Sequence, residues 1–144
     1  MTIKHWRFLL VGWLVFIFLA SSSLFSADNT KDILVFDLLN FIVRKSAHIV
    51  EYAILTFLWF RSLWTVPERF KSCVIRSVVL SVLYAMSDEW HQSFVPNRLG
   101  TWEDVVWDAV GAVFMGVAIG YLYKQNNDKI KQRLLGSFSV RELL

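Results

Sequence analysis

A single cysteine, Cys73, stands among the 144 residues of this sequence, which excludes an internal disulfide bond and any metal site built from several cysteines. The sequence also lacks a glycine-rich phosphate-binding loop, a serine in a nucleophile-elbow context and a cysteine in a reactive environment. It contains no internal repeat and no low-complexity tract. These absences leave no established catalytic motif on which an enzymatic function would rest.

Apolar residues are abundant instead, since 56% of the chain is hydrophobic and 16% is aromatic. A water-soluble domain of this size buries only about 68–70% of the surface that its unfolded chain exposes, so we expect lipid to solvate the excess. Four apolar stretches, at residues 8–25, 46–66, 73–90 and 105–123, approach the roughly 20 residues that a membrane-spanning helix needs. The sequence therefore predicts an all-α integral membrane bundle of four transmembrane helices.

Residues 1–32 contain the first apolar stretch, and two interpretations apply to them. Basic residues, an apolar core and the small residues Ser21, Ser22, Ser23 and Ser26 describe a cleavable secretory signal as well as a helix that stays attached. The apolar run is long for a signal. We favour the retained helix and predict that residues 1–32 form an N-terminal membrane anchor.

The lysines and arginines are unevenly distributed between the two sides of the membrane. Eleven of the fifteen lie before the first apolar stretch, around the junction of the second and third, or after the fourth, and the other four lie on the opposite side. Because short cytoplasmic segments carry the excess of Lys and Arg, both termini of this multi-pass chain are expected in the cytoplasm. The net charge of +3 does not gather on a soluble face with interleaved aromatics, so no nucleic-acid partner is expected.

Two further segments are expected to lie on the membrane surface. Residues 33–43 are apolar except for Asp37 and Asn40, which share a face, a pattern typical of an interfacial helix. The basic tail at residues 124–144 either rests on anionic headgroups in the cytoplasm or is disordered. Residues 33–123, between the anchor and the tail, are predicted to form one domain that holds the interfacial helix and three transmembrane helices.

Ionisable and polar residues gather at one end of three predicted helices, although such groups inside a span are costly. They are Lys45, His48, Glu51 and Tyr52 in the second stretch, Asp88, Glu89, His91 and Gln92 in the third, and Asp104 and Asp108 in the fourth. Helical spacing places Lys45, His48 and Tyr52 on one face. The predicted topology puts all three groups at the non-cytoplasmic surface, with Arg98 in the connecting loop close by. We therefore predict a polar pocket that opens outward and binds a ligand.

Each part of this predicted pocket also has a purely structural interpretation. Lys45 would serve as an interfacial anchor and His48 as a hydrogen-bonded core residue. Asp88 and Glu89 would be loop residues that face water, and Asp104 would be a helix N-cap. Taken together, these interpretations require three helices to place matching polar faces at one level by coincidence, so we favour the pocket.

The same residues, with the segment that joins them, resemble the VanZ-like family of small bacterial membrane proteins. The resemblance implies a place in the cytoplasmic membrane of a bacterium. The resemblance covers roughly the last two-thirds of the chain and rests on Lys45, His48, Glu51, Tyr52 and Leu55, on Asp88, Glu89, His91 and Gln92, on Phe94, Pro96 and Arg98, and on Asp104, Asp108 and Gly111. Two positions depart from the family pattern, since the family often has glycine where Asn97 stands and asparagine where Asp108 stands. The resemblance implies a link to glycopeptide resistance, because the family's namesake lowers susceptibility to teicoplanin, and it implies no mechanism.

Three hypotheses for the function follow, and we favour the first. A non-catalytic module would bind a lipid headgroup or a lipid-linked envelope precursor, or shield it from a lipoglycopeptide, through Lys45, His48, Tyr52, Asp88, Gln92, Arg98, Asp104 and Asp108. An enzyme would act on an envelope substrate by acid–base chemistry, with candidate catalytic residues His48, Glu51, Asp88, Glu89 and His91 beside an anionic headgroup held by Lys45 and Arg98. A metal site would use His48, Glu51, Glu89 and His91, whose spacing is a weak signature. No metal or other cofactor is predicted.

Small residues recur at every fourth position of the last predicted helix, at Ala112, Gly116 and Gly120. Such a stripe lets helix backbones approach closely. We expect it to pack against a neighbouring helix of the same chain, with a homo-oligomer through Gly116 and Gly120 as the alternative. Membrane lipids are the other expected partners.

Overall fold

The computed structural model describes residues 2–22, 37–95 and 101–125, and this part of the chain is almost entirely helical. Its elements are α1 (Ile3–Ser21), α3 (Asp37–Leu63), the short 3-10 helix η2 (Pro67–Arg69), α4 (Phe70–Gln92) and α5 (Trp102–Lys124). No strand occurs among these described residues. The predicted all-α architecture is confirmed.

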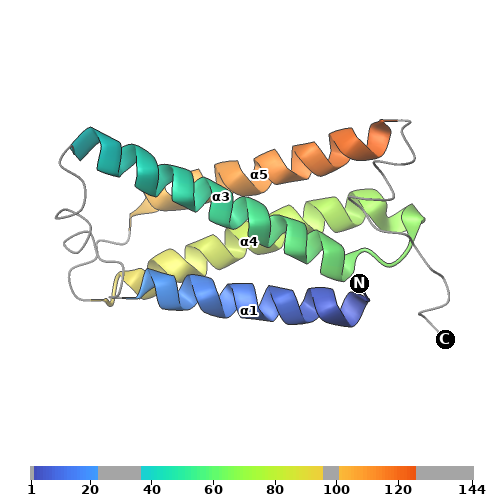
Figure 1. Ribbon diagram of the computed structural model, residues 1–144, viewed down its shortest axis with the longest axis horizontal. Coiled ribbons are helices and arrows are strands. Elements are labelled where there is room, and N and C mark those ends of the chain that lie inside the picture. Colours follow the sequence, from blue (N-terminus) through green and yellow to red (C-terminus); the bar gives the residue numbers. More distant parts are fainter. Residues whose placement is uncertain (1, 23–36, 96–100, 126–144) are drawn as a thin grey trace.

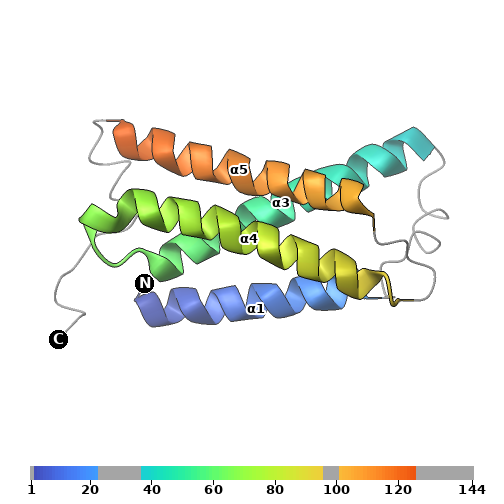
Figure 2. The same ribbon diagram turned by 180° about the vertical axis from the view of Figure 1, so that it is seen from behind.

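The four long helices lie lengthwise in one bundle and alternate in direction (Figure 1, Figure 2). Alternation of this kind is the usual result when short connections join consecutive helices. As a consequence, α1 and α4 end, and α3 and α5 begin, at one end of the bundle, which we call the site end. The opposite end, called the far end, holds the N-terminus of α1 and the connection from α3 to α4.

Within the described part of the chain, α1, α4 and α5 are long and apolar enough to cross a membrane. Large apolar side chains such as Phe8, Ile75 and Phe114 are exposed on these three helices, where lipid would solvate them better than water. The predicted second span, residues 46–66, lies largely within α3, which does not meet this condition and carries several polar residues in its first half. The fold is therefore an all-α membrane bundle in which α3 packs against the other three long helices.

The segment expected to form a separate interfacial helix differs from that expectation. Residues 37–43 are the first turns of α3 and continue without a break into the part of the helix that packs in the bundle. The physical reason is that the sequence from Asp37 to Leu63 contains no proline or glycine, so nothing interrupts the backbone hydrogen bonds. Residues 33–36 lie outside the described residues.

The apolar core is built around α3, which contacts α1, α4 and α5. One cluster joins Leu10 and Ile17 of α1 with Tyr52, Leu55 and Leu58 of α3, and Ala85 of α4 and Val105 of α5 complete it. A second cluster towards the far end consists of Phe60, Trp64, Phe70, Cys73 and Ile119. Because α1 contributes to the first cluster, its packing supports the interpretation of α1 as a retained helix, which stays a prediction.

Two glycines of α5 sit where the helix meets its neighbours, and a third does not. A Cβ atom at Gly111 would lie 2.2 Å from the backbone oxygen of Ile49, so α5 touches the backbone of α3 at this point. A Cβ atom at Gly116 would lie 2.7 Å from Cγ2 of Val78 on α4. Gly120 has no atom within 4 Å of such a Cβ. The small residues thus serve packing inside the chain at two positions, while the homo-oligomer through Gly116 and Gly120 stays a prediction.

Candidate functional site

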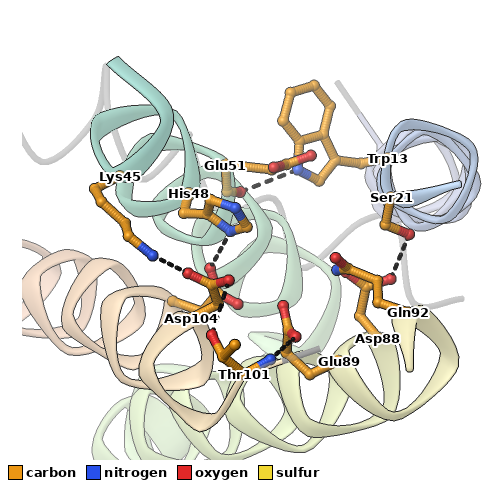
Figure 3. Close-up of polar contacts among 11 residues, drawn as sticks. Trp13, Ser21, Lys45, His48, Glu51, Asp88, Glu89, Gln92, Thr101 and Asp104 are labelled. Carbon is orange, nitrogen blue, oxygen red and sulfur yellow. Dashed lines mark hydrogen bonds and ion pairs between the residues drawn. The ribbon is translucent and has the colours of Figure 1, made fainter. Parts of the chain in front are cut away.

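Polar side chains from all four long helices meet at the site end of the bundle (Figure 3). The contributing residues are Ser21 of α1, Lys45 and His48 of α3, Asp88, Glu89 and Gln92 of α4, and Asp104 and Asp108 of α5, with Thr101 immediately before α5. We call this set the polar cluster. Its members lie where the antiparallel topology brings two helix ends and two helix beginnings together.

The first half of the polar cluster joins α3 to α5 through two cation–carboxylate pairs. Lys45 forms an ion pair with Asp104, and Nδ1 of His48 lies 2.9 Å from Oδ1 of Asp108. The pairs stack along the helices because Lys45 and His48 are three residues apart and Asp104 and Asp108 are four apart, so each set occupies one helix face. The Asp108 side chain is only 1% exposed, whereas that of His48 is 20% exposed. A buried carboxylate therefore stands behind an imidazole that reaches the surface.

The close approach at Gly111 explains why these pairs form. Gly111 is three residues beyond Asp108 and therefore lies on the same face of α5, and Ile49 directly follows His48 on α3. A larger residue than glycine would push the two backbones apart, since its Cβ would overlap the Ile49 carbonyl group. The glycine is thus part of what positions the polar cluster.

Glu89 of α4 links the polar cluster to the start of α5. Its Oε2 accepts a hydrogen bond of 2.9 Å from the backbone N–H of Thr101, which is the N-cap residue of α5. The Thr101 hydroxyl donates to Oδ2 of Asp104 at 3.2 Å. Two carboxylates therefore stand at the positive end of the α5 dipole, a favourable position for negative charge. The interpretation of Asp104 as the N-cap is wrong, because Asp104 lies three residues inside the helix.

The second half of the polar cluster joins α1 to α4. Asp88 accepts hydrogen bonds from the hydroxyl of Ser21 at 2.6 Å and from Nε2 of Gln92 at 2.9 Å. Asp88 and Glu89 are each only 6% exposed and lie within the last turns of α4, so they are not loop residues that face water. Ser21 was missed by the sequence analysis, where it counted only as a small residue near a cleavage site. Its place at the end of the first apolar stretch was the available signal, because that end shares a membrane surface with the other polar groups.

Three other predicted site residues lie beside the polar cluster. His91 packs its ring against Phe18 of α1, with centroids 4.5 Å apart, and its buried Nδ1 has no hydrogen-bond partner in the described part of the chain. Glu51 is half-buried, and its backbone carbonyl accepts a hydrogen bond of 3.1 Å from Trp13 of α1. Tyr52 is buried in the apolar core, where its hydroxyl also lacks a partner among the described residues. Arg98 lies outside the described residues.

The structure does not gather the weak metal-ligand candidates His48, Glu51, Glu89 and His91 into one site. Among the described residues, no group of three or more histidine, cysteine, aspartate or glutamate side chains is arranged to hold a metal ion. His91 faces α1, while His48 faces α5. The chemistry that this arrangement supports is hydrogen bonding and charge pairing.

One buried atom of the polar cluster has no partner among the described residues. Oε1 of Glu89 is buried and accepts no hydrogen bond from any described residue, although Oε2 of the same carboxylate is occupied. In Figure 3 this carboxylate points towards the space between the α3–α5 pairs and the Asp88–Gln92 pair. Buried oxygens of this kind are nearly always hydrogen-bonded in folded proteins, so the bare atom indicates a place for a donor that is not part of the described structure.

The family of the chain follows from comparison with known proteins. A family model described as VanZ/LLP1 matches residues 6–124, which include most of α1 and all of α3, α4 and α5. No curated protein and no solved structure matches the chain. The chain belongs to the VanZ/LLP1 family, in agreement with the resemblance seen in its sequence motifs.

Proposed function

We propose that this member of the VanZ/LLP1 family binds the polar headgroup of a lipid-linked or other envelope component at the polar cluster. The observation that carries the proposal is the buried, unpartnered Oε1 of Glu89 among side chains contributed by four helices. A buried acceptor without a donor costs about 1–3 kcal/mol, and a ligand that donates a hydrogen bond to it recovers that cost. A hydroxyl, amide or ammonium group on the headgroup meets this requirement.

The exposed rim of the polar cluster supports a ligand that approaches from the membrane surface. Lys45 and His48 are half-buried and present positive or hydrogen-bonding groups in front of the buried Asp108. An anionic portion of the headgroup would contact Lys45, and a donor group would reach Glu89 further inside. On the charge distribution of the chain, we propose that this entrance faces the outside of the cell.

Glycopeptide resistance is the physiological outcome that this proposal favours. The VanZ-like family is linked to reduced susceptibility to teicoplanin, and a membrane protein that holds or shields an envelope precursor would act at the surface that such antibiotics reach. The proposal therefore includes protection of a lipid-linked envelope component from a teicoplanin-type lipoglycopeptide.

The substitution Glu89→Gln tests the binding site. The amide oxygen of glutamine preserves the acceptor for the Thr101 N–H, while the amide nitrogen replaces the bare acceptor with a donor. The matched control is Glu103→Gln, since Glu103 is an exposed carboxylate in the first turn of α5. Each variant would be purified from a deletion strain, and the co-purifying envelope lipids and cell-wall precursors would be identified by mass spectrometry beside teicoplanin susceptibility.

We expect the wild type and Glu103→Gln to retain the same lipid-linked component and the same tolerance, and Glu89→Gln to lose both at unchanged abundance in the membrane. Equal retention and tolerance in Glu89→Gln would overturn the role of this carboxylate. Loss of the Glu89→Gln protein from the membrane would show instead that the carboxylate is required for the folded bundle and not for a ligand.

An enzymatic alternative is favoured by one observation, the 2.9 Å contact between His48 and Asp108. A carboxylate that fixes one imidazole nitrogen leaves the other free to act as a general acid or base on an envelope substrate. Incubation of the purified protein with labelled envelope lipids distinguishes the two functions. A modified lipid that forms with the wild type and not with His48→Ala supports the enzyme, whereas bound but unmodified lipid supports the binding module.

A further inference from the structure

Arg61 of α3 is a half-buried cation at the far end of the bundle, away from the polar cluster. Its guanidinium forms no ion pair or hydrogen bond with any described residue, and its Nε is completely buried. A charged group placed in a membrane bundle is costly unless an opposite charge accompanies it. An anion from outside the chain would remove that cost.

The indole ring of Trp6 on α1 holds the guanidinium in place. The central carbon of the Arg61 guanidinium lies 4.7 Å from the centroid of the Trp6 ring, which itself packs edge-on against Phe57 of α3 at 5.8 Å. The attraction between a cation and an aromatic face fixes the position of the group but provides no hydrogen-bond acceptor. The buried Nε1 of Trp6 also lacks an acceptor among the described residues. Helices α1 and α3 thus bring two unsatisfied donor groups together.

The two Nη groups of Arg61 are the part of this arrangement that a ligand can reach. Arg61 is partly exposed, and its Nε, but neither Nη, is among the buried atoms that lack a partner in the described part of the chain, so the terminal nitrogens are not enclosed. These nitrogens form a planar fork that matches the oxygens of a phosphate group. Arg61 is also two residues from the end of α3 and at the same end of the bundle as the beginning of α1. The ends of spanning helices are where a chain leaves the hydrocarbon of the bilayer. Phospholipid phosphates are concentrated at that level.

We propose that Arg61, held by Trp6, binds the phosphate of a phospholipid headgroup between α1 and α3 at the far end. The proposal does not depend on which leaflet surrounds the far end, because both leaflets carry phospholipid phosphates. It is independent of the proposed function, which concerns the opposite end of the bundle. The lipid would act as a structural ligand that joins α1 to α3.

The test uses the full-length protein extracted in mild detergent and exchanged into a lipid-free detergent solution. Native mass spectrometry and phosphorus assay then measure the phospholipid that remains bound. The variants are Arg61→Gln and the matched control Arg76→Gln, which removes an exposed arginine of α4. We expect the wild type and Arg76→Gln to retain phospholipid and Arg61→Gln to lose it. Equal retention by Arg61→Gln and the wild type would overturn the proposal.

A second measurement separates a lipid from free phosphate. Short-chain phosphatidylglycerol and inorganic phosphate are added in turn to delipidated protein, and the melting temperature is recorded. We expect the lipid, and not inorganic phosphate, to raise the melting temperature of the wild type and of Arg76→Gln. An equal shift with inorganic phosphate would overturn the lipid in favour of a simple anion site.

A third variant keeps the proposal testable if Arg61→Gln does not accumulate in the membrane. Arg61→Lys retains the positive charge but removes the planar fork and the fixed contact with the indole ring. We expect Arg61→Lys to release phospholipid on detergent exchange while Arg76→Gln keeps it. Undiminished retention in Arg61→Lys would show that charge alone at the membrane surface is sufficient, which contradicts a built phosphate site.

Discussion

His48 of α3 and Asp108 of α5 lie 2.9 Å apart, one helical turn from the point where the two backbones touch at Gly111. This contact couples the packing of the helices to the geometry of the polar cluster. A change that separates the backbones would also separate the imidazole from its carboxylate. The packing glycine and the polar pair should therefore respond together to mutation.

Gly111→Ala is expected to destabilise the protein by about 1–3 kcal/mol, because the added methyl group would overlap the Ile49 carbonyl and force the helices apart. Gly120→Ala is the control, since its methyl group meets no atom within 4 Å. In a helix interior this control should be neutral or stabilising by up to roughly 1 kcal/mol. Thermal unfolding in detergent measures both. Equal melting temperatures for the two variants would contradict the close approach at Gly111.

Ser21→Ala is expected to weaken the docking of α1 on α4, because it removes the hydroxyl that donates to Asp88. Hydrogen bonds to charged groups contribute about 1.5–3 kcal/mol, so the free energy of unfolding should fall by a similar amount. Ser22→Ala is the matched control, since the one bond of the Ser22 hydroxyl among the described residues is to the Phe18 carbonyl of its own helix. Unfolding titration in mixed detergent micelles gives both values. A Ser21→Ala protein as stable as Ser22→Ala would show that the Ser21 hydroxyl of α1 does not contribute to the polar cluster.

Lys45→Met is expected to destabilise the protein more than Arg44→Met, although the two positions are adjacent. Lys45 pairs with the largely buried Asp104, whereas Arg44 is exposed. The expected loss for Lys45→Met lies between the roughly 0–1 kcal/mol of an exposed ion pair and the roughly 3–5 kcal/mol of a buried one. The melting temperatures of Lys45→Met and Arg44→Met, measured under the same conditions, test this difference in stability. A larger effect at Arg44 would contradict the pairing.

Orientation in the membrane can be tested with single cysteines introduced into a Cys73→Ala background. The native Cys73 is buried, so its failure to react would carry no information about sidedness. Ser72 is exposed near the start of α4, and Glu103 is exposed near the start of α5. In intact cells an impermeant thiol reagent should label Glu103→Cys, and it should reach Ser72→Cys only after permeabilisation. The reverse pattern would place the polar cluster on the cytoplasmic side.

The sequence alone was sufficient to predict the meeting of polar residues from α3, α4 and α5. Short connections impose alternating directions, so polar groups at the start of α3, the end of α4 and the start of α5 necessarily share one end. The partners could not be predicted from spacing, because they depend on how far each helix is rotated about its axis. The role of Ser21 shows this well, since α1 is apolar on nearly every face and its pattern does not fix that rotation.

At the beginning of α3, the sequence pattern could not distinguish between two structures. The alternation of apolar residues with Asp37 and Asn40 has the same form in an interfacial helix and in the exposed first turns of a longer helix. Only the continuity of the backbone through residue 43 distinguishes the two. The cap of α5 is similar, because Thr101 and Asp104 are both residue types that cap helices, so residue type alone did not show that Asp104 is not the cap.

The central position of α3 also has a consequence for how the chain is made. The ribosome produces α3 before α5, so Lys45 and His48 enter the membrane before their partners Asp104 and Asp108 have been synthesised. During that interval α3 carries unmatched polar groups, which disfavour its stable insertion. Insertion of α3 should therefore be completed only when α5 arrives, and nascent chains that end before α5 are expected to be released from the bilayer or degraded.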